Sequence, residues 1–308
     1  MRRGEWLTER EVGTVRAMSR PVHLSPLTQD DLEAIRALVS ACVDHDGGLP
    51  AASEAPFALR TFLAGPGVGI RDPDGSLVAA AALGEPFDGV VPASGAVHPS
   101  HRGRGIGQSL LEWVIGAAGD LRVQLRSECA TEEFEDLAAR FGFEQVFSEY
   151  VMQRSTAPPL DSRTVTGIEM RPWATDTVDA FFEAYTASFA DRPGFPGWSR
   201  HQWVESHVSD EEFRPEASMV VTDTSGLPIA FVLVSDAWIE QIGVVPASRR
   251  KGIAGMLLRH AIDAIGAAGS EQVWLNVNEN NPSALSLYEH AGFTRFGRRC
   301  RFERTSSS

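Results

Sequence analysis

The sequence is poor in cysteine and has no paired-cysteine motif. Its three cysteines, Cys42, Cys129 and Cys300, lie far apart in a chain of 308 residues, and no Cys-x-x-Cys spacing occurs. Structural zinc sites need closely spaced cysteine or histidine ligands, and disulfide frameworks need cysteines in pairs. The sequence therefore predicts no metal site and no disulfide framework, and it favours a reducing cytoplasm.

Long apolar runs and an excess of basic residues are also missing. No run of about 18 apolar residues occurs, so no membrane span is expected. Residues 1–6 lack the apolar stretch of a secretion signal. The 28 Lys and Arg against 41 Asp and Glu give a net charge of −13, which argues against a nucleic acid partner. This charge suits a cationic small molecule, although an acidic excess also serves solubility alone.

One short basic turn is present twice. Residues 102–107 read Arg-Gly-Arg-Gly-Ile-Gly and residues 249–254 read Arg-Arg-Lys-Gly-Ile-Ala, each after a Val-x-Pro sequence and before an apolar pattern of helical period. Glycines at a strand-to-helix turn let the backbone approach a phosphate, and the free amides of the helix start can bind it. The repeat predicts a duplicated domain that binds a nucleotide cofactor.

The order of predicted elements is the same in both halves of the chain. We predict an extension at 1–19, an N-terminal domain at 20–155, a linker rich in Pro, Ser and Thr at 156–166, and a C-terminal domain at 167–308. Each domain is expected to be α/β (α+β), with a mixed central sheet flanked by helices. Strands are predicted over Ser76–Ala81, up to Val97, and over Leu121–Leu125, Ile168–Met170, Ser218–Thr222, Pro228–Val234, Ile239–Val244 and Val273–Val277, with helices over Phe134–Arg140, Val178–Phe189 and Ser283–His290.

The second half carries two motifs that resemble those of the GCN5-related N-acetyltransferases (GNAT). In that family an Arg/Gln-x-x-Gly-x-Gly/Ala turn holds the pyrophosphate of acetyl-CoA, and a later Asn-x-x-Ala-x-x-Leu-Tyr helix completes the cofactor site. Residues 249–254 match the turn, and residues 281–288 match the helix. The layout is similar to the tandem actinobacterial type that includes mycothiol synthase. The resemblance implies two tandem GNAT domains and acetyl-CoA-dependent transfer to an amine.

The acceptor is less narrowly defined. Trp238 stands where that tandem type has an acidic residue, and residues 231–234, Phe-Val-Leu-Val, replace a His-Trp-Thr-Lys segment. We therefore expect the primary amine of another small, cationic molecule, such as a metabolite, an amino sugar or an antibiotic. The alternatives are mycothiol synthesis, with cysteinyl-glucosaminyl-inositol as acceptor, and a non-catalytic acyl-CoA-binding module or sensor. The protein is expected to be a monomer or a homodimer.

The resemblance also assigns roles to residues of the second half. Tyr288 would donate a proton to the coenzyme A thiolate after direct attack of the amine in a ternary complex. Glu240 or Asp236 could accept the amine proton, or either could be a solvated acid at a strand end. Phe195, Trp198, Trp203 and Trp238 could line the substrate pocket, or they could be core residues. Cofactor contacts are expected at Ile242, Val244, Arg249, Arg250, Lys251, Gly252, Ile253, Ala254, Gly255 and Asn281.

The first half keeps the turn but lacks the rest of the pattern. Ala138 occupies the position that matches Tyr288, and no Asn-x-x-Ala segment leads into that helix. We expect this half to be catalytically degenerate, binding acetyl-CoA structurally or binding nothing. Any cofactor contacts here would come from Val97, Arg102, Gly103, Arg104, Gly105 and Gly107.

Overall fold

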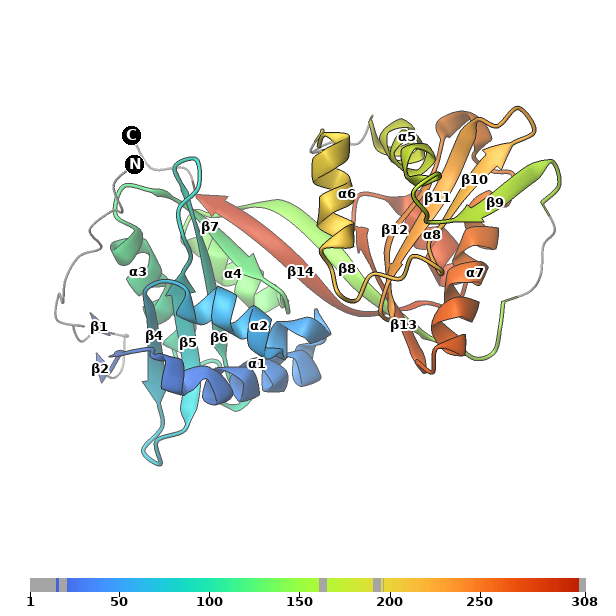
Figure 1. Ribbon diagram of the computed structural model, residues 1–308. Coiled ribbons are helices and arrows are strands. Elements are labelled where there is room, and N and C mark those ends of the chain that lie inside the picture. The colour runs from blue at the N-terminus through green and yellow to red at the C-terminus, as the bar shows by residue number, and fades with distance from the viewer. Residues whose placement is uncertain (1–14, 17–20, 161–164, 191–194, 196, 305–308) are drawn as a thin grey trace. The chain divides into compact units, whose positions relative to one another are not determined.

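The computed structural model describes residues 15–16, 21–160, 165–190, 195 and 197–304, and it divides into two compact units (Figure 1). Unit 1 consists of Met1–Tyr150 and Phe296–Ser308, and unit 2 of Val151–Arg295. Each unit is a mixed sheet with helices, which confirms the predicted fold class. No helix of the described residues is long and apolar enough to cross a membrane.

Unit 1 is built on strands in the order β3-β4-β5-β6-β7-β14. Neighbouring strands are antiparallel except β6 and β7, which are parallel. In chain order the elements are β1 (Val15–Arg16), β2 (Pro21–Val22), β3 (Ser25–Pro26), η1 (Gln29–Asp31), α1 (Leu32–Asp46), η2 (Pro50–Ser53), α2 (Ala55–Ala58), η3 (Leu59–Leu63), β4 (Gly67–Arg71), β5 (Leu77–Leu83), β6 (Val90–Val97), η4 (Pro99–His101), α3 (Ile106–Ala118), β7 (Arg122–Ser127), α4 (Glu132–Arg140), β8 (Glu144–Ser155, which runs on into unit 2) and β14 (Thr294–Arg304).

The core of unit 1 lies on both faces of β5. All seven residues of this strand are buried, and four of them are alanines whose small side chains let helices approach closely. Ala79 and Ala81 belong to a core cluster with the apolar face of α3, while Ala80 and Ala82 belong to one with α1. A strand covered on both faces reads as a continuous apolar run, which is the pattern that residues 77–83 show.

The sheet of unit 1 is completed by the last strand of the chain. Residues 300–304 of β14 pair antiparallel with residues 123–127 of β7, and Cys300 and Phe302 are buried in the core around α3. Close backbone contact fixes this strand against the end of α1, since a Cβ on Gly47 would lie 1.6 Å from the Phe296 carbonyl oxygen. Unit 1 is therefore discontinuous in sequence, whereas the predicted N-terminal domain is one contiguous stretch.

Unit 2 has strands in the order β8-β13-β12-β11-β10-β9, with β12 and β13 parallel. The strands predicted over Ser218–Thr222 and Pro228–Val234 are found as the antiparallel pair β10 and β11, and the helix predicted over Val178–Phe189 is found with those bounds. The elements are β9 (Ile168–Pro172), α5 (Val178–Phe189), α6 (Arg200–Val208), β10 (Met219–Asp223), β11 (Pro228–Ser235), β12 (Trp238–Val244), η5 (Pro246–Ser248), α7 (Ile253–Ala267), β13 (Gln272–Asn278) and α8 (Pro282–His290).

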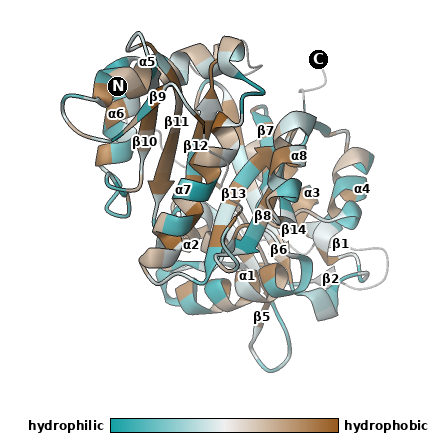
Figure 2. Ribbon diagram, turned by 90° about the vertical axis from the view of Figure 1, so that its right-hand side faces the viewer, coloured by the Kyte–Doolittle hydropathy of each residue, from teal (hydrophilic) through white to brown (hydrophobic). Residues whose placement is uncertain are grey.

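Strand β11 is the most hydrophobic element of unit 2 (Figure 2). Its Phe231 and Leu233 pack with α5 and α6 in an aromatic cluster that includes Phe181, Tyr185 and Trp203. The apolar stripe of α7 is buried as well, from Ile253 to Ile265. These helices hold the ends of β12 in place, and β12 leads directly into the second basic turn.

Candidate active site

The two basic turns have the same backbone conformation. Gly105 and Gly252 precede α3 and α7 with φ of 81° and 85°. Two residues earlier, Gly103 and Arg250 also have positive φ, at 72° and 61°. Left-handed backbone is natural for glycine and strained for arginine. The left-handed conformation of Arg250 therefore costs conformational free energy, and such backbone strain is common at functional sites.

The first arginine of the second turn braces the strand before it. Arg249 Nε donates to the Val244 carbonyl at 3.0 Å, and Arg249 Nη2 donates to the Ser188 carbonyl at 3.2 Å. Its guanidinium thus joins the end of β12 to the end of α5. These bonds position the turn, and a direct contact of Arg249 with the cofactor stays a prediction.

The start of α7 presents backbone donors. The amide of Met256 is the first to bond within the helix, to the Gly252 carbonyl at 3.1 Å. The amides of Ile253, Ala254 and Gly255 precede it and have no carbonyl four residues back inside the helix. Arg250 and Lys251 are exposed. Amides at a helix start beside two exposed cations fit a pyrophosphate, because both the dipole and the charges favour an anion.

A β-bulge opens the sheet just ahead of this turn. The register between β11 and β12 shifts so that Leu233 faces Gln241 and Val234 faces Ile239, which leaves Glu240 as the extra residue. Strands β12 and β13 pair at Trp238/Trp274 and Ile239/Leu275, and no later pair joins them in the described chain. Bulges increase local twist and release ladder groups. The five residues from Glu240 to Val244 therefore form one arm of a fork whose backbone can meet a ligand.

The candidate acids lie at different places on this arm. Glu240 is exposed at the bulge. Asp236 lies in the exposed β11–β12 turn with φ of 43°, and its amide donates to the Glu212 carbonyl at 2.8 Å. Ile242 and Val244 are half-buried beyond the bulge. Only Glu240 of the two acids lies within the fork.

Helix α8 carries the matching asparagine and tyrosine. Asn281 caps it, because its Oδ1 accepts from the Ala284 amide at 3.2 Å, and Pro282 takes the first helical position. Tyr288 is 6% exposed, with its ring 5.9 Å from that of Phe293. A tyrosine held this firmly suits a proton donor, since its hydroxyl position is fixed by packing.

Comparison with known proteins agrees with this geometry. A model of the acetyltransferase (GNAT) family matches residues 177–293, and a model of an acetyltransferase (GNAT) domain matches residues 68–145. Mycothiol acetyltransferase of Thermobispora bispora is 30% identical over 287 residues, which cover 87% of this chain and 94% of that protein. The chain belongs to the acetyltransferase (GNAT) family. It is an acetyl-CoA-dependent acyltransferase with two tandem GNAT domains.

Other relatives support the same layout. Mycothiol acetyltransferase of Kineococcus radiotolerans is 30% identical over 287 residues, covering 88% of this chain and 92% of that protein. A GCN5-related N-acetyltransferase from Sphaerobacter thermophilus has a TM-score of 0.73 at 23% identity, with 92% of this chain and 98% of that one covered. A tandem GNAT protein from the clavulanic acid pathway has a TM-score of 0.62 at 14% identity, covering 93% and 99%. At these identities the solved structures show the fold alone.

The four predicted substrate residues are not gathered on one wall of this GNAT unit. Trp203 is fully buried, stacked on Tyr185 at 4.9 Å, and its Nε1 donates to Gln241 Oε1 at 3.3 Å. Phe195 packs on Tyr185 in the same cluster. Trp198 is 41% exposed, and Trp238 stacks on Trp274 at 5.7 Å where β12 and β13 are still paired. Trp203 and Phe195 thus act as core, and Trp238 lies at the base of the fork.

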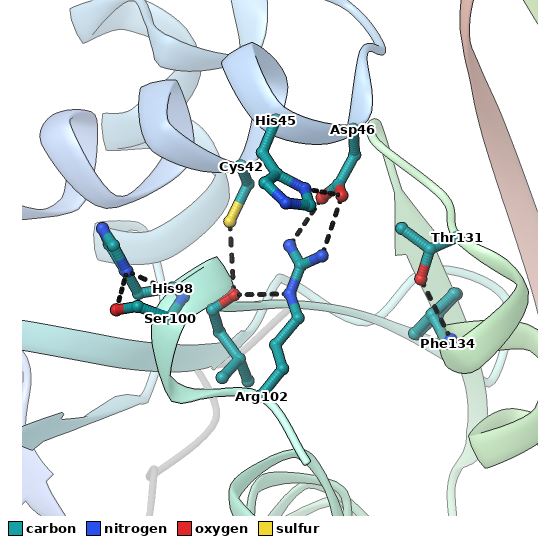
Figure 3. A network of polar contacts seen from close by, with 9 residues as sticks. Cys42, His45, Asp46, His98, Ser100, Arg102, Thr131 and Phe134 are labelled. Carbon is teal, nitrogen blue, oxygen red and sulfur yellow. Dashed lines mark hydrogen bonds and ion pairs between the residues drawn. The ribbon is translucent and has the colours of Figure 1, made fainter.

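The turn of the first GNAT unit is closed by a carboxylate (Figure 3). Arg102 Nε donates to the Val97 carbonyl at 3.1 Å, as Arg249 does to Val244. Its two terminal nitrogens form a bidentate pair with Asp46 at 2.8 and 2.5 Å. This bond to Asp46 raises the pKa of Arg102. Burial opposes ionisation of Asp46, but hydrogen bonds from Arg102 and His45 leave its pKa below the usual value.

The rest of the first turn is exposed. Arg104 donates to the Ser100 carbonyl at 3.0 Å and lies with Gly103 and Gly105 at the surface. A Cβ on Gly107 would meet Leu137 of α4 at 3.1 Å, so this glycine serves close helix packing. Ala138 is fully buried where the second unit has Tyr288. The first unit therefore has the turn but a buried alanine at the position that matches Tyr288.

Two features of the site carry no clear signal in the sequence. One is the bulge at Glu240, because the two polar residues between Ile239 and Ile242 do not by themselves indicate an inserted residue. The other is the pairing of Asp46 with Arg102, which joins residues from different elements. The sequence around Asp46 does show an acidic segment, Asp44-His45-Asp46, before two glycines. That pattern alone indicates only a polar turn and does not point to Arg102.

Proposed function

We propose that unit 2 transfers the acetyl group of acetyl-CoA to the primary amine of a small molecule. The observation that supports this most is the fork at Glu240, which opens immediately before a turn whose amides are free to bind an anion. Acetyl-CoA supplies the acyl group as a thioester. The amides of residues 253–255 and the cations of Arg250 and Lys251 would hold its pyrophosphate.

The chemical step needs three contributions from the protein. Proximity of amine and thioester is the largest, worth up to about 7–11 kcal/mol in favourable cases. A backbone amide of the fork near Val244 would hold the thioester carbonyl as charge develops on its oxygen. Tyr288 would give its hydroxyl proton to the leaving thiolate, and Glu240 would accept the amine proton directly or through water. Asp236, in the turn outside the fork, is the second choice for that base.

For the acceptor we favour the cysteinyl amine of cysteinyl-glucosaminyl-inositol, since relatives that span nearly the whole chain are mycothiol acetyltransferases. A different small, cationic amine is the second candidate. It is favoured by Trp238, which stacks on Trp274 at the base of the fork and stands where the tandem type that the sequence resembles has an acidic residue. A non-catalytic acyl-CoA sensor is the remaining alternative.

The test is an acceptor panel with the purified full-length protein and acetyl-CoA. It would contain cysteinyl-glucosaminyl-inositol, glucosaminyl-inositol, cationic amines such as polyamines and aminoglycosides, and anionic amines such as glutamate. Acetylated products are followed by mass spectrometry, because a cysteinyl acceptor interferes with thiol detection. We expect the cysteinyl compound to be acetylated fastest. Preference for a cationic amine would select the second candidate, and tight acetyl-CoA binding without any product would indicate the sensor.

Two variants assign the reaction to a unit. Tyr288→Phe is expected to lower turnover strongly while acetyl-CoA still binds. Gly105→Glu, which places a carboxylate at the first turn, is expected to leave most turnover intact. If Tyr288→Phe kept its turnover and Gly105→Glu lost most of it, the reaction would belong to unit 1 and the proposal would be overturned.

A further inference from the structure

Two arginines of unit 1 face each other across neighbouring strands, outside both basic turns. Strand β14 pairs antiparallel with β7, and in this register Arg301 stands directly opposite Arg126. Directly opposed residues of an antiparallel pair point to the same face of the sheet, with Cβ atoms about 4.5–5.5 Å apart. The next pair along, Phe302 and Leu125, points to the other face and is buried in the core around α3. Both guanidinium groups therefore lie on the face of the sheet that points away from this core.

Neighbouring side chains hold the two arginines in place. Arg126 Nε donates to Gln124 Oε1 at 2.7 Å, and Gln124 Nε2 donates to Glu303 Oε1 at 2.7 Å. The guanidinium carbon of Arg301 lies 4.9 Å from the centre of the Phe147 ring, a cation–π contact. Arg126 is exposed and Arg301 is half-buried. Within the described chain these contacts use Nε of one arginine and the flat face of the other, so the terminal nitrogens of both remain as donors for a ligand.

The nearby carboxylates are already engaged by other arginines of β14. Arg298 forms an ion pair with Glu135, and Arg299 Nε lies 2.6 Å from Glu128 Oε2. Arg301 faces a second guanidinium instead, and among the described residues no ion pair joins either of these two groups to a carboxylate. Like charges directly opposite each other destabilise a sheet. An anion bound between them would replace this repulsion with attraction.

The electrostatic environment of Arg126 agrees with an uncompensated pair. Although its side chain reaches the surface, partial burial and then the charge of Arg301 lower the pKa of Arg126, against the opposing effect of Glu128. Both arginines stay protonated at neutral pH, because the guanidinium does not lose its proton under these conditions. The pair is therefore a fixed double positive charge.

We propose that Arg126 and Arg301 bind a phosphate group, free or in a monoester, between their guanidinium groups. A phosphate group carries a charge of about −1.5 to −2 at neutral pH, and its oxygens can accept from two guanidinium forks at once. A monocarboxylate has one charge and two oxygens, which a single fork already satisfies. The site shares no residue with the two basic turns, the fork or Tyr288, so it is independent of the acetyl transfer proposed for unit 2.

The site is tested by labelling the arginines of the folded full-length protein with phenylglyoxal and measuring the rate at each arginine by peptide mass spectrometry. We expect inorganic phosphate and glycerol 3-phosphate to slow the modification of Arg126 and Arg301 several-fold. Sodium chloride at equal ionic strength and sodium acetate should leave both rates nearly unchanged. Arg60 is the matched control, because its guanidinium carbon also lies over a ring, that of Phe57 at 5.3 Å, and the described chain gives it no contact with a second arginine.

Two variants show whether both arginines are needed. Arg301→Gln should abolish the protection of Arg126 by phosphate, and Arg126→Gln should abolish that of Arg301, whereas Arg60→Gln should leave both protected. Circular dichroism would show that the variants stay folded, and labelling of the parent protein decides the matter if one does not. Absence of protection, equal protection by chloride, equal slowing at Arg60, or protection of Arg126 that persists in folded Arg301→Gln would each overturn the proposal. Neither acetyl-CoA nor an acceptor is present, so failure here would not bear on acetyl transfer.

Discussion

The two basic turns share one backbone but differ in what surrounds them. Arg102 is neutralised by Asp46, whereas Arg249 donates only to carbonyls among its partners in the described chain. In unit 1, β6 and β7 pair over five positions, from Val90/Arg122 to Ser94/Arg126, and β5 and β6 keep a regular register. In unit 2, the bulge at Glu240 ends the pairing after two positions. The two turns thus share a backbone but differ in the strand that leads into them, and it is this difference on which the proposed site in unit 2 rests.

The largest effect is expected from removing β14, the C-terminal strand that completes the sheet of unit 1. Truncation after Arg295 removes the β14 residues that pair with β7 and bury Cys300 and Phe302 in unit 1. Loss of a buried aromatic side chain alone costs about 3–5 kcal/mol, and an exposed strand edge is added. We expect unit 1 to unfold, measured as loss of hydrogen-exchange protection in residues 90–127. Truncation after Arg304 is the control and should be neutral. Retained protection after the longer truncation would mean that unit 1 folds without β14.

The second-largest effect is expected from a change at Tyr288 that leaves the basic turn of unit 2 intact. Tyr288→Phe keeps the ring packed on Phe293 and removes the hydroxyl that we propose as the proton donor. We expect kcat to fall about 100-fold or more, with little change in KM for acetyl-CoA, because general acid catalysis is worth about 10²–10⁴-fold. Steady-state kinetics on the preferred acceptor give the measurement. Adding Ala138→Tyr to this variant should not restore activity, since β6 and β7 of unit 1 stay paired and form no fork. An unchanged kcat in Tyr288→Phe would exclude this residue as the acid.

As the pH is lowered, the stability of unit 2 should fall at a higher pH than the stability contributed by the Arg102–Asp46 pair of unit 1. Burial among Trp173, Trp203 and Phe213 lowers the pKa of His207 to about 4, against the weaker opposing effect of Asp210. The unfolded chain then binds more protons than the folded one between roughly pH 6.5 and 4, so stability falls as pH is lowered through that range, by about 3 kcal/mol in all. Asp46, whose pKa is lowered, contributes stability that is lost only below its unfolded value near 4.

His207→Phe should flatten this pH dependence, as followed by urea unfolding between pH 7 and 4.5. His201→Phe, at an exposed position of the same helix, is the matched control and should leave the slope unchanged. A parent protein equally stable at pH 7 and 4.5 would show that His207 is not buried in its neutral form.

Much of this architecture follows from the sequence. The apolar period of residues 253–265 predicts the buried face of α7, and the strand predicted over Ile239–Val244 before the basic turn is found as β12. The partner of β14 could not be predicted, because a period of two shows which side chains share a face but not which strand lies alongside. The sequence also left open whether Trp203 lines a pocket or belongs to the core. An aromatic residue fits a pocket wall and a core equally well until its neighbours, here Tyr185 and Phe181, are known.

The smallest and most discriminating change is made at both turns. Gly252→Ala and Gly105→Ala place a Cβ at left-handed positions with nearly equal φ, so each should cost about 1–2 kcal/mol of stability. Their effect on KM for acetyl-CoA should differ, because only the turn at Gly252 follows the fork in β12. We expect a several-fold rise for Gly252→Ala and none for Gly105→Ala. Equal rises would show that both turns hold the cofactor during turnover, and the distinction drawn from the bulge would then have no functional meaning.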